Sequence, residues 1–172
     1  MYDAVRIRAL AAYLSKVFNA RLGATESEAV EVLPCCAWVF PKRVPPQTIL
    51  AEVFVEDFPQ EGKKRARDVE GATKQAIDRV DAFEMMTYEV TEGAMVLRHP
   101  RVVGRMWTDF TLHSVDPMIG TSHSKERANG GVRGIATMLR TCQYGLDARR
   151  LGLSVPEIPQ EWEGLEDWPE PG

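Results

Sequence analysis

The chain has 172 residues, of which 44% are hydrophobic and 27% charged, and a formal net charge of −4. These values fit one globular domain with a substantial core, and they lack the strong basic excess of a dedicated nucleic-acid-binding protein. The three cysteines cannot form a complete set of internal disulfides, and no stretch approaches the roughly 18 apolar residues of a membrane span.

The first half of the chain predicts two helices and two strands. Apolar residues spaced three or four apart predict a helix of about twenty residues that ends before Gly23. Residues 31–40 are apolar on both faces, which is typical of a covered strand, and 48–56 is its expected partner. A second apolar stripe predicts a helix over 63–83.

The second half predicts a hairpin and a third helix. Residues 85–99 and 101–116 alternate in polarity and predict a long antiparallel hairpin, with Pro100 between its two strands. A long polar loop then leads to a helix that follows Asn129 as N-cap and ends near Gly152. The expected fold class is α+β: a small, mainly antiparallel sheet with a long hairpin, flanked by about three helices.

The C-terminal residues 155–172 differ in composition from the rest of the chain. They contain six carboxylates, four prolines and two of the four tryptophans, without Lys or Arg. We expect residues 1–154 to form one α+β domain and 155–172 to form an extended acidic arm. Trp162 and Trp168 gain by burial, either against a neighbouring subunit or against their own domain.

The arginines of the predicted hairpin are candidates for an interface. They could form a basic rim that meets a nucleic-acid backbone or the acidic arm of a neighbouring subunit. We favour the second reading because it uses two features of the chain, and we expect no specific nucleic-acid ligand. The predicted interface residues are Trp162, Trp168, Glu166, Asp167, Arg98, Arg101 and Arg105.

No motif in the chain predicts a reaction. His113, Asp116 and His123 come nearest to a metal-binding set, since two imidazoles and a carboxylate can hold iron, but their spacing matches no metal motif. The chain has no GxSxG element and no phosphate-binding loop motif. We therefore assign no catalytic, metal-binding or cofactor-binding residue, and we expect no cofactor and no enzymatic activity.

The order of predicted elements across about 1–150 resembles that of the small α+β ring proteins of tailed bacteriophages, the tail terminators and head–tail joining (neck) proteins. This resemblance implies a homo-oligomeric ring that caps the tail tube or joins it to the head. It implies partners that are copies of the chain and other structural proteins, no membrane, and a place inside the cell during assembly and then in the virion.

Two alternatives remain open. The first is a small-ligand-binding or metal-dependent enzyme domain, with a pocket near Trp107, His113 and Asp116. The second is an adaptor protein that uses its C-terminal tail as a recognition segment, with the two tryptophans as anchors.

Overall fold

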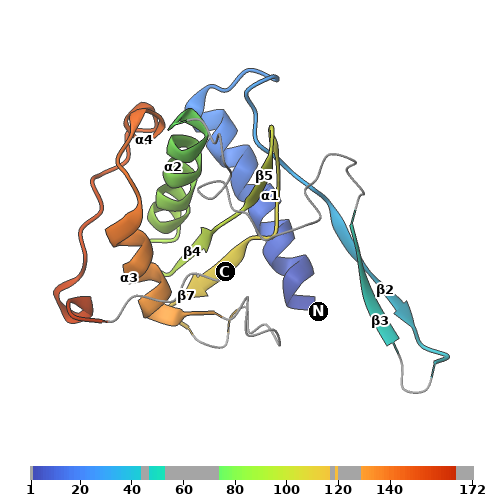
Figure 1. Cartoon of the computed structure of the whole chain (residues 1–172). Coiled ribbons are helices and arrows are strands. Elements are labelled where there is room, and N and C mark those ends of the chain that lie inside the picture. The colour runs from blue at the N-terminus through green and yellow to red at the C-terminus, as the bar shows by residue number, and fades with distance from the viewer. Residues whose placement is uncertain (1, 44–46, 53–73, 117–118, 120–128, 166–172) are drawn as a thin grey trace.

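The computed structural model describes residues 2–43, 47–52, 74–116, 119 and 129–165 and has the predicted α+β fold (Figure 1). Its elements are α1 (Tyr2–Leu22), β1 (Glu31–Val32), β2 (Cys35–Phe40), β3 (Gln47–Glu52), α2 (Lys74–Val90), β4 (Met95–Arg98), β5 (Arg101–Val103), β6 (Met106–Thr108), β7 (Thr111–Ser114), α3 (Gly131–Thr141), α4 (Leu146–Arg150) and the 3-10 turn η2 (Gln160–Trp162). The long first helix ends before Gly23, as predicted.

Helix α2 is the central helix of the fold. It packs against α1, α4 and β4, and every residue from Val80 to Thr87 is buried. Phe83 lies at the middle of an aromatic cluster, with its ring centroid 5.5 Å from that of Phe18 and 5.4 Å from that of Trp107. The prediction that residues 85–90 begin a strand is wrong: the helix continues to Val90, because its buried face includes polar residues that hide the helical period.

Strands β4 to β7 form one antiparallel ribbon, so the predicted hairpin exists. Its pairs keep a single register: Met95 with Ser114, Arg98 with Thr111, Arg101 with Thr108, and Val103 with Met106. The turn lies at Gly104 and Arg105 and not at Pro100, because Gly104 accepts the left-handed conformation (φ 58°) that a two-residue turn requires. Strand β1 adds to β6 in parallel, with Val32 beside Trp107.

Strands β2 and β3 pair in antiparallel as a second hairpin, which contacts α1 through β2 and projects beyond the other helices in Figure 1. Trp38 lies opposite Ile49, and these side chains are 57% and 41% exposed. The expectation that residues 31–40 form a covered strand is therefore wrong. Within the described ranges, no element covers the Trp38 side of this hairpin.

The C-terminal part folds back over the domain. The single predicted third helix is divided into α3 and α4 by residues 142–145. The segment after α4 runs along α3, where Ile158 and Trp162 pack against the hydrophobic core and the Arg140 guanidinium donates to the Trp162 carbonyl at 3.3 Å. The division at residue 154 stays a prediction. None of the described helices is long and apolar enough to cross a membrane.

Candidate active site

The ribbon is interrupted between its two paired parts. His99 and Pro100 on one strand, and Asp109 and Phe110 on the other, separate the β4–β7 pairs from the β5–β6 pairs. We call these four residues the ribbon break. His99 and Asp109 both have left-handed backbones, with φ of 54° and 56°. Such conformations cost about 1–3 kcal/mol each in a residue with a side chain and concentrate at functional sites.

Asp109 is held between two arginines from different elements. Its Oδ1 lies 3.7 Å from Nη2 of Arg8 on α1, and its Oδ2 lies 3.3 Å from Nε of Arg101 on β5. Arg8 is itself fixed, because its Nη1 donates to the Leu33 carbonyl at 3.1 Å. The Asp109 side chain keeps 13% of its surface exposed. A carboxylate oriented in this way can accept a proton or a hydrogen bond from a molecule bound at the break.

Thr108 precedes Asp109 and carries a second polar group beside the break. The residue is 3% exposed, and among the described residues its hydroxyl has no hydrogen-bond partner. Buried hydroxyls almost always have one. A bound molecule could therefore complete the hydrogen bonding of Thr108.

A buried polar network supports the break from the helical side. The Glu84 carboxylate on α2 accepts the Arg98 guanidinium at 3.1 Å through Oε2 and the His99 backbone N–H at 2.9 Å through Oε1. The Cys142 thiol donates to Oε2 at 3.3 Å, and Nη2 of Arg98 donates to the Thr141 hydroxyl at 3.1 Å. The network thus ties α2, β4 and the end of α3 together.

Part of this network has the spacing of a metal site. One ligand atom each of Asp81, Glu84 and Cys142 lies within 4.8 Å of the other two. The Glu84 oxygens already accept three donors, and Oδ2 of Asp81 accepts the Gln143 backbone N–H at 3.0 Å. The buried guanidinium of Arg98 would also repel a cation. The set therefore fits a hydrogen-bonded network better than a metal site.

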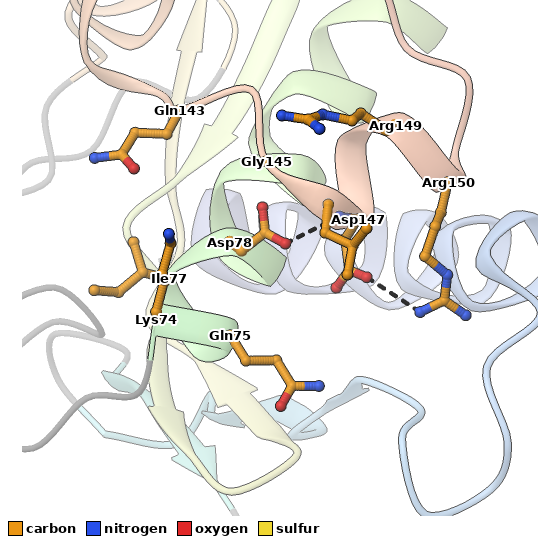
Figure 2. Close-up of a pocket in the computed structure, with 10 residues that line it drawn as sticks. Lys74, Gln75, Ile77, Asp78, Gln143, Gly145, Asp147, Arg149 and Arg150 are labelled. Atoms are coloured by element: carbon orange, nitrogen blue, oxygen red, sulfur yellow. Dashed lines mark hydrogen bonds and ion pairs between the residues drawn. The ribbon is translucent and has the colours of Figure 1, made fainter.

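A cavity of about 770 Å³ lies between the start of α2 and α4 (Figure 2). This volume is typical of a small-molecule site. Across it, Oδ2 of Asp78 accepts the Asp147 backbone N–H at 3.0 Å, and the Asp147 carboxylate binds Arg79 at 3.0 Å and Arg150 at 3.3 Å. The lining residues are Lys74, Gln75, Ile77, Asp78, Gln143, Gly145, Leu146, Asp147, Arg149 and Arg150.

The pocket predicted near Trp107, His113 and Asp116 is not this cavity, since none of the three lines it. Trp107 belongs to the aromatic core, and Asp116 is exposed. His113 is fully buried, and its Nδ1 accepts the Gly130 backbone N–H at 2.8 Å. His123, the third residue of the possible metal set, lies outside the described residues.

The three arginines of the predicted interface each form an ion pair within the chain. Arg98 pairs with Glu84, Arg101 pairs with Asp109, and Arg105 pairs with a glutamate of β1 at 3.1 Å. Trp162 packs against its own domain. The other predicted interface residues, Glu166, Asp167 and Trp168, lie outside the described residues. The assignment of these seven residues to an interface stays a prediction.

The sequence reasoning missed Asp109 of the ribbon break and Glu84, which supports the break from α2. Asp109 interrupts the alternation of the run 101–116, and Glu84 interrupts an apolar stretch of the second helix. A charged residue inside an otherwise apolar run is the signal that could have found both.

The sequence model of the alpha-kinase family matches residues 1–144. This match covers most of the chain, and the chain belongs to the alpha-kinase family. A comparison with curated proteins found no match.

Solved structures of the myosin heavy chain kinase A alpha-kinase domain have the same fold. The apoenzyme matches with a TM-score of 0.70 and 19% identity, and the ADP complex with 0.68 and 21%. An inactive variant of that domain, which carries an aspartate-to-alanine substitution and was solved with ATP, matches with a TM-score of 0.67 and 18% identity. Each match covers 90% of this chain and 60%, 59% and 58%, respectively, of the solved chain, so this chain spans about three fifths of those domains.

Family membership corrects several expectations. The resemblance to phage tail terminators and neck proteins is wrong, and with it the reading as a virion assembly protein without enzymatic activity. The expected partners, copies of the chain in a ring and other structural proteins, are overturned for the same reason. Element order alone misled, because a small sheet flanked by helices occurs in proteins of unrelated function. The alternative prediction, an enzyme domain, agrees with the family better than the prediction of a phage ring protein does.

Proposed function

We propose that the protein acts as a protein kinase, transferring the terminal phosphate of ATP to a hydroxyl group of a protein, with the ribbon break as its reaction site. Membership of the alpha-kinase family over residues 1–144 is the observation that carries this proposal. The similar solved domains, one with ADP and one with ATP, support the choice of nucleotide.

Asp109 has the properties that the reaction needs from a proton acceptor. Kinases use a positioned aspartate to accept the proton of the attacking hydroxyl. Asp109 is the carboxylate of the break, is fixed by Arg8 and Arg101, and keeps part of its surface open to solvent. We assign it this role.

Arg101 is the second group that we assign to the reaction. Its side chain is 28% exposed, against 6% for Arg8, so a bound phosphate can reach it. A guanidinium there stabilises the charge on the transferred phosphoryl group. Arg8 pairs with the other carboxylate oxygen of Asp109 and, being almost fully buried, orients that carboxylate without facing solvent.

The step balances without a further reactant. The bond between the γ-phosphorus and the bridging oxygen breaks, and the protein hydroxyl oxygen forms a new bond to that phosphorus. The hydroxyl proton passes to Asp109 and then to solvent. The products are ADP and a phosphoprotein.

Transfer of a labelled phosphate tests the proposal. The chain is incubated with γ-³²P-labelled ATP, Mg²⁺ and a basic protein acceptor, and label in protein is measured. We expect incorporation that Asp109→Asn abolishes and that Glu89→Gln, which removes the charge of an exposed carboxylate on α2, leaves intact. Absence of incorporation by the unmodified chain would contradict the proposal.

A further inference from the structure

We propose that the cavity between the start of α2 and α4 binds an amphipathic carboxylate, a small molecule that carries one carboxylate group on an apolar chain. The inference is independent of the proposed function, because none of the four residues of the ribbon break lines this cavity. It adds a ligand site that phosphate transfer does not use.

Carboxylates of α2 fix the facing wall of the cavity (Figure 2). Oδ2 of Asp78 accepts the Asp147 backbone N–H at 3.0 Å. One turn further along α2, Oδ2 of Asp81 accepts the Gln143 backbone N–H at 3.0 Å. The Asp78 carboxylate lies so close to Gly145 that a Cβ atom at this position would overlap it. These contacts hold the segment that joins α3 to α4 against α2, so the cavity is preformed, as most small-molecule sites are.

Two cations of the lining are available to an anionic group. Lys74 on α2 and Arg149 on α4 line the cavity from its two walls, and both are exposed. Neither side chain has an ion pair or a hydrogen bond with another residue in the described part of the chain. A guanidinium binds a carboxylate through two parallel hydrogen bonds, and an ammonium adds a second positive charge. A carboxylate can therefore bind between α2 and α4.

The acidic residues of the lining limit the charge of the ligand. The lining contains three cations, Lys74, Arg149 and Arg150, and two carboxylates, Asp78 and Asp147, which gives a net charge of +1. Arg150 is already paired with Asp147 at 3.3 Å. A carboxylate with a single negative charge matches this balance. A phosphate monoester carries close to two negative charges at neutral pH and would be repelled more strongly by the two aspartates.

The apolar part of the ligand has a contact surface of its own. Ile77 on α2 and Leu146 on α4 line the same cavity, and Leu146 is 65% exposed. Covering exposed apolar side chains with an apolar chain stabilises the complex. The volume of about 770 Å³ leaves room for such a chain beside the carboxylate.

Octanoate is the probe, because it joins one carboxylate to an apolar chain. Its binding is followed by NMR through the backbone amides of Gly145 and Leu146. We expect saturable shifts of both amides, about tenfold weaker binding of the shorter hexanoate, and at least about tenfold weaker binding of the uncharged octan-1-ol. Absence of saturable shifts up to the solubility of octanoate would overturn the proposal. Tighter binding of octyl phosphate than of octanoate would overturn the choice of a carboxylate.

Two variants test the assigned contacts. Arg149→Gln removes the guanidinium, and Leu146→Ser removes the apolar wall on α4. Both positions are exposed, so we expect both variants to fold as the unmodified chain does. We expect the dissociation constant of octanoate to rise at least about tenfold in Arg149→Gln and at least about threefold in Leu146→Ser.

Arg6→Gln and Val155→Ser are the matched controls, because Arg6 and Val155 are exposed and do not line the cavity. We expect both to bind octanoate within about twofold of the unmodified chain. Equal dissociation constants for Arg149→Gln and Arg6→Gln would overturn the assigned contact with the carboxylate. Binding is measured without ATP, so a chain that transfers no phosphate would contradict the proposed function and leave this test unaffected.

Discussion

Glu84 on α2 and Arg98 at the end of β4 form an ion pair with a 3.1 Å Oε2–Nε distance, and their side chains are 1% and 0% exposed. The pair joins the central helix to the ribbon 14 residues further along the chain. A buried pair of this kind is costly to break on one side only, because the remaining charge stays in the core.

Glu84→Gln should therefore destabilise the fold. The substitution removes the carboxylate that pairs with the buried Arg98 guanidinium at 3.1 Å, and we expect the free energy of unfolding to fall by about 3–5 kcal/mol in urea titrations. Glu89→Gln, on the same helix, is the control. Glu89 pairs with Arg21 at 3.1 Å, but its side chain is 42% exposed, so the loss should stay below about 1 kcal/mol. Equal losses would contradict the buried pairing.

Gly134→Ala should destabilise the contact of α3 with β7. A Cβ atom at position 134 would overlap the His113 ring, and the buried ring has little room to move. We expect a loss of about 1–3 kcal/mol by thermal or urea unfolding. The double variant with His113→Ala should lose less than the sum of the two single variants. Additive losses would show that the two positions do not touch.

Trp162→Ala should weaken the fold more than Trp38→Ala. Trp162 is half-buried against the core and its carbonyl accepts a bond from Arg140, whereas Trp38 is 57% exposed. We expect a loss of about 1–2 kcal/mol at position 162 and less than about 0.5 kcal/mol at position 38. The reverse order would argue against docking of the C-terminal segment on its own domain.

The titration of Tyr88 offers a second check of this docking. Burial raises the pKa of the Tyr88 phenol above its ordinary value, and the Glu161 carboxylate raises that pKa further. Because the folded state holds this proton more tightly, the contribution of Tyr88 to stability is present below the ordinary pKa of about 10 and is lost as pH rises through the folded value.

Glu161→Gln should lower the pKa of Tyr88 toward its ordinary value. The measurement is the tyrosinate absorbance during an alkaline titration, with Tyr88→Phe used to identify the signal. An unchanged titration of Tyr88 in the Glu161 variant would place this carboxylate away from the ring.

The α+β fold, the first helix and the ribbon could be predicted because their polarity follows the period of a helix or a strand. The site could not, because it depends on residues that break these patterns. Glu84 and Arg98 are charged and would be expected on the surface; only the packing of α2 against β4 brings them together. Likewise, Pro100 suggested a turn, but Gly104 makes the turn and Pro100 lies in the break.

The position of Trp162 in the C-terminal segment could likewise be predicted only in part from the sequence. The sequence predicted that Trp162 gains by burial, and the structure buries it in part against its own core. Whether the receiving surface belonged to the same chain or to another could not be predicted, because the hydrophobic driving force has no direction.

The most direct measurement of the central claim is phosphate transfer by the Asp109→Asn variant alongside its affinity for ATP. If Asp109 accepts the proton of the attacking hydroxyl, transfer from γ-³²P-labelled ATP should fall by about 100-fold or more, while the dissociation constant for ATP, measured by calorimetry, stays within about threefold. Transfer by Asp109→Asn at the rate of the unmodified chain would contradict the assignment of the ribbon break as the reaction site.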